Sequence, residues 1–225
     1  MGMNIVTQID PLVPVKHVLV SVSDKTGLDE LIPELIHIAP DITIISTGGT
    51  YQKIKDILGS QANQQLILVS DYTGQPETQG GLVKTLDFKI YLGLLTETYN
   101  DDHQNDLNRT QASPIDMVIV NLYPFERTVA NPEVTIEQAR GNIDIGGPCM
   151  IRASAKNFIR VASVVDPNDY AGIIDEMKQN KGCTTLKKRF HLAQKAFGHT
   201  CKYDENIFQY LSKQSIEAVS SCYNP

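Results

Sequence analysis

The sequence predicts an α/β fold, in which a parallel sheet lies between two layers of helices and extra helices follow at the C-terminal end. Short apolar runs rich in β-branched residues alternate along the chain with segments whose apolar residues recur at helical spacing. This alternation indicates βαβ units, whose strands pair in parallel. With 225 residues, of which 41% are hydrophobic, the chain is long enough to bury one large core.

Five apolar runs are predicted to be strands. The first, H-V-L-V-S-V-S, is short and rich in valine, which is typical of a strand buried inside a sheet. The spacing of the runs leaves room for a helix or a loop between neighbours. The predicted strands are His17–Ser23, Asp41–Ser46, Leu66–Ser70, Ile115–Asn121 and Val161–Val165.

The segments between these strands are predicted to form helices and loops. Apolar residues from Leu28 to Ile36 recur at helical spacing, although Pro33 requires this helix to begin late or to bend. Gly59 is expected to end a short helix that begins at Tyr51. The polar segment 71–81 is predicted to be an ordered loop, and the polar segment 100–114 is predicted to be a flexible loop. The other predicted helices are 135–140, 168–179 and 184–212, the last with a break near Gly198.

The composition excludes several classes of partner. The formal net charge of −6 provides no broad basic surface, so no nucleic acid partner is expected. The chain begins without a basic region and an apolar core, and no apolar run approaches the roughly 20 residues that span a membrane. We therefore expect a cytoplasmic protein with no membrane partner. Four widely spaced cysteines are expected to be reduced thiols: Cys149, Cys183, Cys201 and Cys222.

Two turns after the first two predicted strands are candidates for binding an anion. Ser21–Gly27 combines hydroxyl groups with Lys25, and Ser46–Thr50 combines hydroxyl groups with two glycines whose N–H groups are accessible. Ligands of open parallel sheets bind at the carboxyl ends of the strands, where both turns lie. Each turn alone is equally consistent with ordinary helix capping. Neither is a G-x-x-x-x-G-K-[ST] loop, so ATP hydrolysis is not indicated.

The stretch from Asn142 to Asn157, N-I-D-I-G-G-P-C-M-I-R-A-S-A-K-N, is a third candidate for ligand binding. Its two glycines allow close approach of the backbone, and Pro148 suits the first position of a helix, whose free N–H groups attract an oxygen or an anion. The alternative is a tight turn that only begins a helix. Lys84 and Tyr123 also lie near predicted strand ends and are further candidates. The alternative is that Lys84 is an ordinary surface charge and Tyr123 an ordinary packed side chain. The five histidines show no metal-ligand spacing, so no metal is expected.

Six motifs, in the same order, resemble those of one family. They are S-V-S-D-K-T-G-L, S-T-G-G-T, V-K-T-L, N-L-Y-P-F, I-D-I-G-G-P-x-M-x-R-A-x-A-K-N and V-V-D-P-x-D-Y. Together they resemble the N-terminal IMP cyclohydrolase domain of the bifunctional purine-biosynthesis enzyme that also carries an AICAR transformylase. The resemblance covers about residues 16–212 and implies a methylglyoxal-synthase-like, Rossmann-like fold of three layers. It also implies closure of formyl-AICAR to inosine monophosphate (IMP) with loss of water, without a metal or an organic cofactor.

The resemblance implies a role for each matching residue. The residues that would hold the 5′-phosphate of the ribotide are Ser21, Ser23, Lys25, Thr26, Ser46, Gly48, Gly49 and Thr50. Those that would contact the base and the reacting formyl group are Lys84 and Thr85. Those that would border the reacting centre are Asn121 and Tyr123. Those that would hold the carboxamide are Asp144, Ile145, Gly146 and Gly147, with Lys156 completing the charge network. The implied catalytic residues are Lys84, Tyr123, Asp144 and Lys156.

The segment around Lys84 departs from the family's pattern G-R-V-K-T-L-H-P-x-x-H-G-G. If the family's arginine binds the substrate, a charged hydrogen bond of about 1.5–3 kcal/mol is missing here. The leading hypothesis is a cyclohydrolase whose activity these departures reduce. The alternatives are a purine-ribotide-binding protein without efficient turnover and a lyase of the methylglyoxal synthase type. The departing residues are Leu82 for the arginine, Asp87 and Tyr91 for histidines, Phe88 for the proline and, further on, Phe158 for a histidine.

The resemblance also predicts the domain organisation and the partners. Residues 1–15 are expected to be an N-terminal extension, and residues 16–225 a single cyclohydrolase-like domain that includes the C-terminal helices. The transformylase domain is expected to be absent. The candidate partners are therefore a small purine ribotide as substrate, a second copy of the chain in a homodimer, and a separate transformylase.

Overall fold

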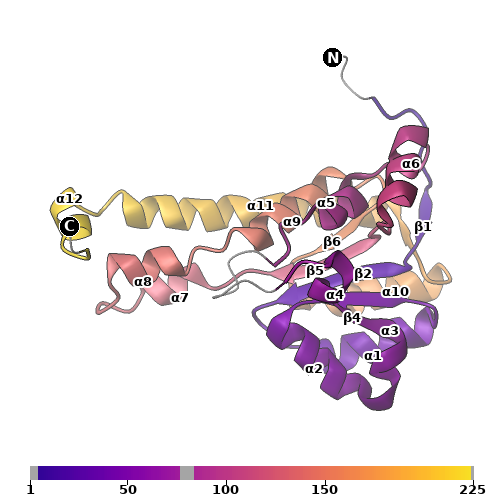
Figure 1. Cartoon of the computed structure of the whole chain (residues 1–225), viewed down its shortest axis with the longest axis horizontal. Helices are drawn as coiled ribbons and strands as arrows, with labels where there is room; N and C mark the ends of the chain where they lie inside the picture. Colours follow the sequence, from indigo (N-terminus) through magenta and orange to yellow (C-terminus); the bar gives the residue numbers. More distant parts are fainter. Residues whose placement is uncertain (1–4, 77–83, 224–225) are drawn as a thin grey trace.

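A parallel sheet of five strands forms the centre of the molecule (Figure 1). The structure is a computed structural model, and it describes residues 5–76 and 84–223. The strands are ordered β4-β3-β2-β5-β6 and every neighbouring pair is parallel, which confirms the predicted sheet. Their bounds are β2 His17–Val22, β3 Thr43–Ser46, β4 Leu66–Leu68, β5 Met117–Asn121 and β6 Ala162–Val164.

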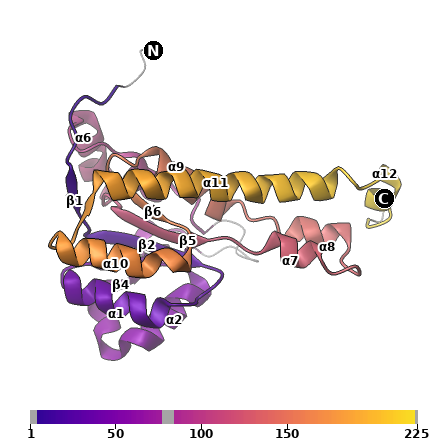
Figure 2. The ribbon, with the colours of Figure 1, turned by 180° about the vertical axis from the view of Figure 1, so that it is seen from behind.

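Alternating side chains of the sheet enter two hydrophobic cores, one on each face. In β2, Val18 and Val20 enter the first core and Leu19 enters the second, as the two-residue period of a strand requires. Because both faces are apolar, helices cover both and produce the predicted three layers (Figures 1 and 2). The first face carries α1 (Leu28–Ile38), α2 (Gly48–Leu58) and α10 (Tyr170–Gln179). The second carries α5 (Phe88–Leu95), α9 (Gly146–Lys156) and the first half of α11 (Leu186–Leu211).

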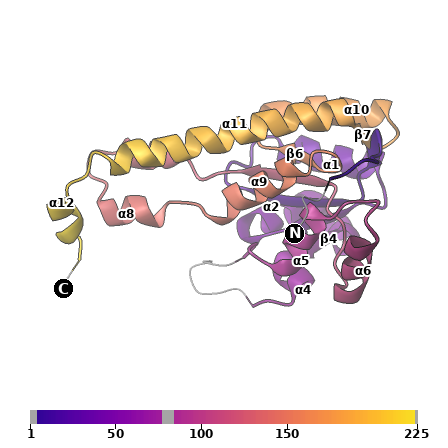
Figure 3. The ribbon, with the colours of Figure 1, turned by 90° about the horizontal axis from the view of Figure 1, so that it is seen from above.

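An arm of helices extends from the body along the long axis of the molecule (Figures 2 and 3). The ring of Phe125 in the arm packs edge-on against two tyrosines of α11, Tyr203 and Tyr210, at centroid distances of 6.4 and 5.8 Å. These aromatic contacts hold the helix that begins at Phe125 against α11. Its elements are the second half of α11, α7 (Phe125–Val129), α8 (Ile136–Gly141) and α12 (Ile216–Ser220).

Short elements complete the described chain. Leu12–Pro14, within the predicted N-terminal extension, forms β1 and pairs antiparallel with β7 (Cys183–Thr185), so this part of the chain is joined to the body. No helix among the described residues is long and apolar enough to cross a membrane. The remaining elements are η1 (Gly59–Gln61), α3 (Ala62–Gln65), α4 (Val69–Thr73), α6 (Asp101–Thr110) and η3 (Pro167–Asp169).

Two predictions about helices are wrong. The segment predicted as a flexible loop contains α6, because the side chain of Asn100 caps the helix by accepting a hydrogen bond from the N–H of His103, and Leu107 is buried beneath it. The break predicted near Gly198 is absent, and α11 is continuous. A glycine inside a helix costs only about 1 kcal/mol relative to alanine, and the burial of Ala196 and Thr200 on either side outweighs that cost.

Two predicted boundaries are also wrong. The strand predicted over 66–70 ends at Leu68, since Val69 begins α4 and the hydroxyl of Thr73 donates to its carbonyl. α2 begins at Gly48, three residues before the predicted start at Tyr51, so the second predicted turn is the first turn of a helix. The predicted loop 71–81 lies only partly within the described residues.

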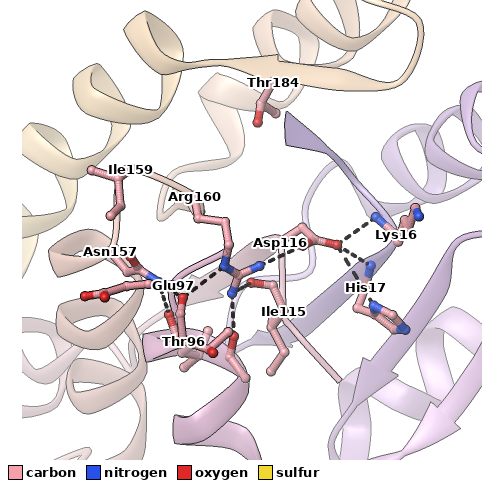
Figure 4. Close-up of polar contacts among 12 residues, drawn as sticks. Lys16, His17, Thr96, Glu97, Ile115, Asp116, Asn157, Ile159, Arg160 and Thr184 are labelled. Atoms are coloured by element: carbon pink, nitrogen blue, oxygen red, sulfur yellow. Dashed lines mark hydrogen bonds and ion pairs between the residues drawn. The ribbon is translucent and has the colours of Figure 1, made fainter. Parts of the chain in front are cut away.

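A buried ion pair joins the amino ends of three strands (Figure 4). Arg160, which lies just before β6, donates to the carboxylate of Asp116, just before β5, at 2.8 Å. The other oxygen of Asp116 accepts the N–H groups of Lys16 and His17 at the start of β2, both at 2.9 Å. The guanidinium also donates to the carbonyl groups of Gly93, Thr96 and Ile115. The pair is therefore well satisfied although both side chains are buried.

Asp116→Ala is expected to lower the free energy of unfolding by about 3–5 kcal/mol, because it leaves the Arg160 charge buried and unpaired. This corresponds to a fall in melting temperature of roughly 6–20 °C, measurable by thermal and urea unfolding. The matched control is Arg109→Ala, which breaks the exposed Arg109–Asp106 pair and should cost at most about 1 kcal/mol. Equal losses in the two variants would contradict the structural role given to Asp116.

Candidate functional site

A cavity of about 490 Å³ opens at the carboxyl edge of the sheet, where β2, β3 and β5 end. Its walls come from the β2–α1 loop, the first turn of α2, the segment after β5, residues 84–86 and the beginning of α9. The sequence prediction placed these segments at one site, and the structure brings them together. The predicted site residues that line the cavity are Ser21, Ser23, Lys25, Gly48, Gly49, Thr50, Lys84, Thr85, Asn121, Tyr123, Asp144, Ile145, Gly146 and Gly147.

Two lysines converge on the first turn of α2. A methyl group placed on Gly48 would lie 3.3 Å from Lys84 Nζ, and one placed on Gly49 would lie 4.0 Å from Lys25 Nζ. The first N–H groups of a helix have no partner within the helix, and the helix dipole favours negative charge there. Gly48 also has a φ of +42°, which a side chain would strain. This end of the cavity therefore suits a phosphate dianion.

Hydroxyl groups connect the end of β2 to the start of α2. Ser21 Oγ lies 2.9 Å from Thr47 Oγ1, and both residues line the cavity. The hydroxyl of Thr50 accepts the N–H of Val22 at 3.1 Å and donates to its carbonyl at 3.0 Å, which ties α2 to the end of β2. Thr50 therefore fixes the shape of the anion end, while its hydroxyl has no donor proton left for a ligand.

The opposite wall is built around Asp144. Its Oδ1 accepts the N–H of Gly147 at 2.9 Å, and its own N–H donates to the hydroxyl of Tyr203 at 2.7 Å. Burial raises the pKa of the Asp144 carboxyl, although hydrogen bonds from the N–H groups of Gly147 and Gly146 act in the opposite direction. A carboxylate with a raised pKa is a better proton acceptor than an exposed one.

The two glycines are required by close packing in this wall. A Cβ on Gly147 would lie 2.5 Å from both Asp144 Oδ2 and Leu122 Cδ2, and a Cβ on Gly146 would lie 2.8 Å from Thr85 Oγ1. Because Lys84 reaches the anion end and Thr85 reaches Gly146, this dipeptide spans the cavity. The Nζ of Lys84 thus lies near the predicted phosphate position, whereas the resemblance predicted a contact with the base and the formyl group.

The rim of the cavity carries exposed apolar side chains. Tyr123 is 60% exposed, Ile145 is 59% exposed and Leu86 is 40% exposed, although all three line the cavity. Binding cavities typically combine such apolar surface with a few convergent polar groups. The rim suits a flat ring, and the polar floor suits the groups that the ring carries.

Three predicted residues lie outside the cavity. Ser46 is fully buried and donates to the carbonyl of Val20 at 2.8 Å, because strand alternation turns it away from Thr47. Thr26 bonds to the carboxylate of Asp24 through its N–H and its hydroxyl, so it shapes the loop without lining the cavity. Lys156 is exposed in the last turn of α9, about 15 Å along the helix from Gly146, and the described cavity gives no support for its predicted role.

The departures from the family's pattern do not fall on residues that line the cavity, as far as the structure describes them. Asp87 caps α5 by accepting the N–H of Lys89 at 2.8 Å. The hydroxyl of Tyr91 is buried, which raises the pKa of the phenol, and the neighbouring Cys149 thiol and Asp144 carboxyl act in the same direction. Phe158 packs edge-on against Phe190. Leu82, in place of the family's arginine, lies outside the described residues.

Two residues that support the site were missed by the sequence analysis. Thr47 lies inside the second predicted turn, and the two-residue period of a strand would have selected it instead of Ser46. Tyr203 lies 59 residues after Asp144 in α11, and nothing in the sequence links the two. Within the described residues, no group of three or more His, Cys, Asp or Glu side chains is arranged to hold a metal ion.

Residues 27–149, more than half of the chain, match the model of the MGS-like domain. The chain belongs to the MGS-like domain family. Residues 154–224 match the model of the AICARFT/IMPCHase bienzyme. The two matches follow each other along the chain, and together they agree with the resemblance that the motifs indicated.

Known relatives extend well beyond this chain. The bifunctional purine biosynthesis protein PurH of Acetivibrio thermocellus is 46% identical over 200 residues, which cover 89% of this chain and 37% of the relative. PurH of a Thermoanaerobacter species is 48% identical over 203 residues, covering 90% of this chain and 38% of the relative. The chain thus spans less than two fifths of the length of these relatives. The crystal structure of ForH is also similar, with a TM-score of 0.76 and 28% identity over 88% of this chain and 97% of that chain.

Asp144→Asn is expected to raise stability relative to the wild type at neutral pH, provided the amide keeps the bond to Gly147. Because burial raises the pKa of Asp144, the folded protein binds a proton more readily than the unfolded chain, so ionisation destabilises the fold. The advantage of the variant should therefore appear as pH rises above about 4 and vanish below it. Urea unfolding across this range measures it, with Asp41→Asn at an exposed position as the control. An advantage that grows as pH falls would contradict this environment for Asp144.

Proposed function

We propose that the protein is an IMP cyclohydrolase, which closes the ring of 5-formamidoimidazole-4-carboxamide ribotide to give IMP and water. One observation carries the proposal: an anion end and a carboxylate wall face each other across a single cavity. A ribotide carries its phosphate at one end and its reacting base at the other. The matches to the bienzyme model and to PurH proteins support the same reaction.

The phosphate would bind at the first turn of α2, between the ammonium groups of Lys25 and Lys84. Two positive charges match the dianion, and charge-assisted hydrogen bonds are about twice as strong as neutral ones. The base would then lie against the exposed rim of Tyr123 and Ile145, with its carboxamide towards Asp144. Binding in this pose would hold the carboxamide nitrogen close to the formyl carbon.

Ring closure requires one bond to form and water to leave. The carboxamide nitrogen attacks the formyl carbon and passes one proton to Asp144, whose raised pKa suits this task. The formyl oxygen becomes an oxyanion. The N–H groups of Gly146 and Gly147 already donate to Asp144, so the ammonium of Lys84 is the donor assigned to this charge, as the alternative to its contact with the phosphate. The oxyanion then takes the proton back from Asp144 and becomes a hydroxyl group.

The departing hydroxyl needs a second proton. We assign this transfer to Tyr123, whose side chain lines the mouth of the cavity and is 60% exposed. The hydroxyl leaves as water, the formamido nitrogen passes its proton to the Tyr123 phenolate as the new C=N bond forms, and the atoms balance as IMP plus water. Lys156 is given no part in these steps because it lies outside the cavity.

The alternative, a ribotide-binding protein without turnover, rests on the departures near Lys84. One of them has a structural explanation away from the cavity, since Asp87 caps α5, and Tyr91 does not line the cavity although its hydroxyl lies close enough to Asp144 to interact with it electrostatically. The explanation for Asp87 favours the enzyme. A homodimer and an association with a separate transformylase, which would supply the formylated ribotide, also remain part of the proposal. Mass photometry of the protein alone and with a transformylase would detect either.

Purified protein incubated with the formylated ribotide is expected to form IMP, followed by chromatography or absorbance. Lys84→Ala should lower kcat/KM by about 100-fold or more, because one of two cations on the ligand is lost. A loss carried by KM would assign Lys84 to the phosphate, and a loss carried by kcat would assign it to the oxyanion. The matched control is Lys55→Ala, which removes an exposed lysine of α2 outside the cavity and should leave both constants unchanged.

The assay also separates the hypotheses. IMP binding in the absence of any turnover would contradict the cyclohydrolase and support the binding protein. Neither binding nor turnover would overturn both. Conversion of dihydroxyacetone phosphate would favour a lyase of the methylglyoxal synthase type instead.

A further inference from the structure

The side chain of Asn121, the last residue of β5, holds the backbone of Asp24 with two hydrogen bonds. Asn121 Oδ1 accepts the N–H of Asp24 at 2.8 Å, and Asn121 Nδ2 donates to the carbonyl of Asp24 at 2.8 Å. The two residues are 97 positions apart in the sequence. The carboxamide therefore forms a clamp between β5 and the β2–α1 loop, and both of its polar atoms are engaged.

The clamped residue lies at the centre of the anion end. Ser23 and Lys25, which flank Asp24, both line the cavity, whereas Asp24 itself does not. The carboxylate of Asp24 extends the arrangement, because it accepts the N–H of Thr26 at 2.9 Å and its hydroxyl at 2.6 Å. Fixing the backbone of Asp24 thus fixes the directions in which Ser23 and Lys25 leave the loop.

The loop has little packing to hold it without the clamp. Asp24 and Thr26 are exposed, and the two hydrogen bonds of Asn121 are themselves exposed. A second cavity of about 760 Å³ lies on the other side and is also lined by Ser23, Asp24 and Asn121. The loop therefore lies between two cavities. Its position is determined by hydrogen bonds rather than by buried contacts.

We propose that Asn121 is a positioning residue for the phosphate of the ribotide and acts on it through Asp24, not a residue that contacts the reacting centre. This inference rests on the proposed function. Without the clamp, Lys25 and Ser23 would have to be ordered when the ligand binds, and that ordering would oppose phosphate binding. The base end is built by Tyr123 and the start of α9, which the clamp does not touch. Removing the clamp should weaken the binding of the phosphate and leave the binding of the base unchanged.

Comparing IMP with inosine, which lacks the phosphate, tests this directly by calorimetry. The wild type is expected to bind IMP much more tightly than inosine. In Asn121→Ala, loss of two hydrogen bonds should weaken IMP by about 10-fold or more while inosine changes by less than about threefold. In kinetics the loss should fall on KM rather than kcat. Circular dichroism and melting temperature establish that the variant is folded.

A second substitution of Asn121, one substitution at the base end and one control outside the cavity complete the test. Asn121→Asp keeps the shape and the acceptor but loses the donor to the Asp24 carbonyl and adds a negative charge, so IMP should weaken at least as much as in Asn121→Ala. Tyr123→Ala, at the base end, should weaken IMP and inosine by equal factors. Asn168→Ala, an exposed asparagine outside the cavity, should change neither.

The outcomes separate this inference from the function on which it rests. A wild type that prefers IMP, with Asn121 variants that lose IMP and inosine equally, overturns the inference and leaves the function standing. The same holds if both Asn121 variants keep the wild-type preference. A wild type that binds neither ligand overturns the proposed function and the inference with it.

Discussion

The buried pair of Arg160 and Asp116 is the constraint on which the position of the site depends. It joins the starts of β2, β5 and β6 at one edge of the sheet, and the site lies at the other. Asp116 fixes the register between β2 and β5 at their amino ends. Five residues further along both strands, this register pairs Val22 with Asn121. A slip of one residue would turn Asn121 to the opposite face and separate it from Asp24. The ion pair therefore determines where Asn121 and Asp24 meet at the cavity, although neither of its own residues lines the cavity.

The cavity itself depends on places where the backbone leaves no room for side chains. Gly48 lets an ammonium group approach the first turn of α2, and Gly147 lets the Asp144 carboxylate approach the first turn of α9. The start of α2 thus lies beside two ammonium groups, which would receive the phosphate in the proposed function, and the start of α9 lies beside a carboxylate, which would receive the proton. Tyr203 from the arm supports the second wall, so α11 contributes to the site as well as to the core.

The sheet and most of the site could be predicted because their signals are local. Apolar runs mark strands, and glycines with hydroxyl-bearing residues mark the turns that follow them. It was harder to predict which residue of a turn faces the cavity. Ser46 and Thr47 are adjacent, and the pleat of the strand decides which of the two side chains points towards the cavity. The capping of α6 by Asn100 outweighed the polar composition of its segment. The support from Tyr203 and the clamp of Asn121 on Asp24 join residues far apart in sequence, and no local pattern predicts such contacts.

The central claim is that one cavity holds a ribotide in a single direction, with its phosphate at α2 and its base at α9. A crystal structure of the protein with IMP tests it most directly. The account predicts phosphate density at Gly48 and Gly49 between Lys25 and Lys84, with the purine ring against Tyr123 and its carbonyl side facing Asp144. A reversed ligand, with its phosphate at Gly146 and Gly147, or a ligand in the second cavity would contradict it.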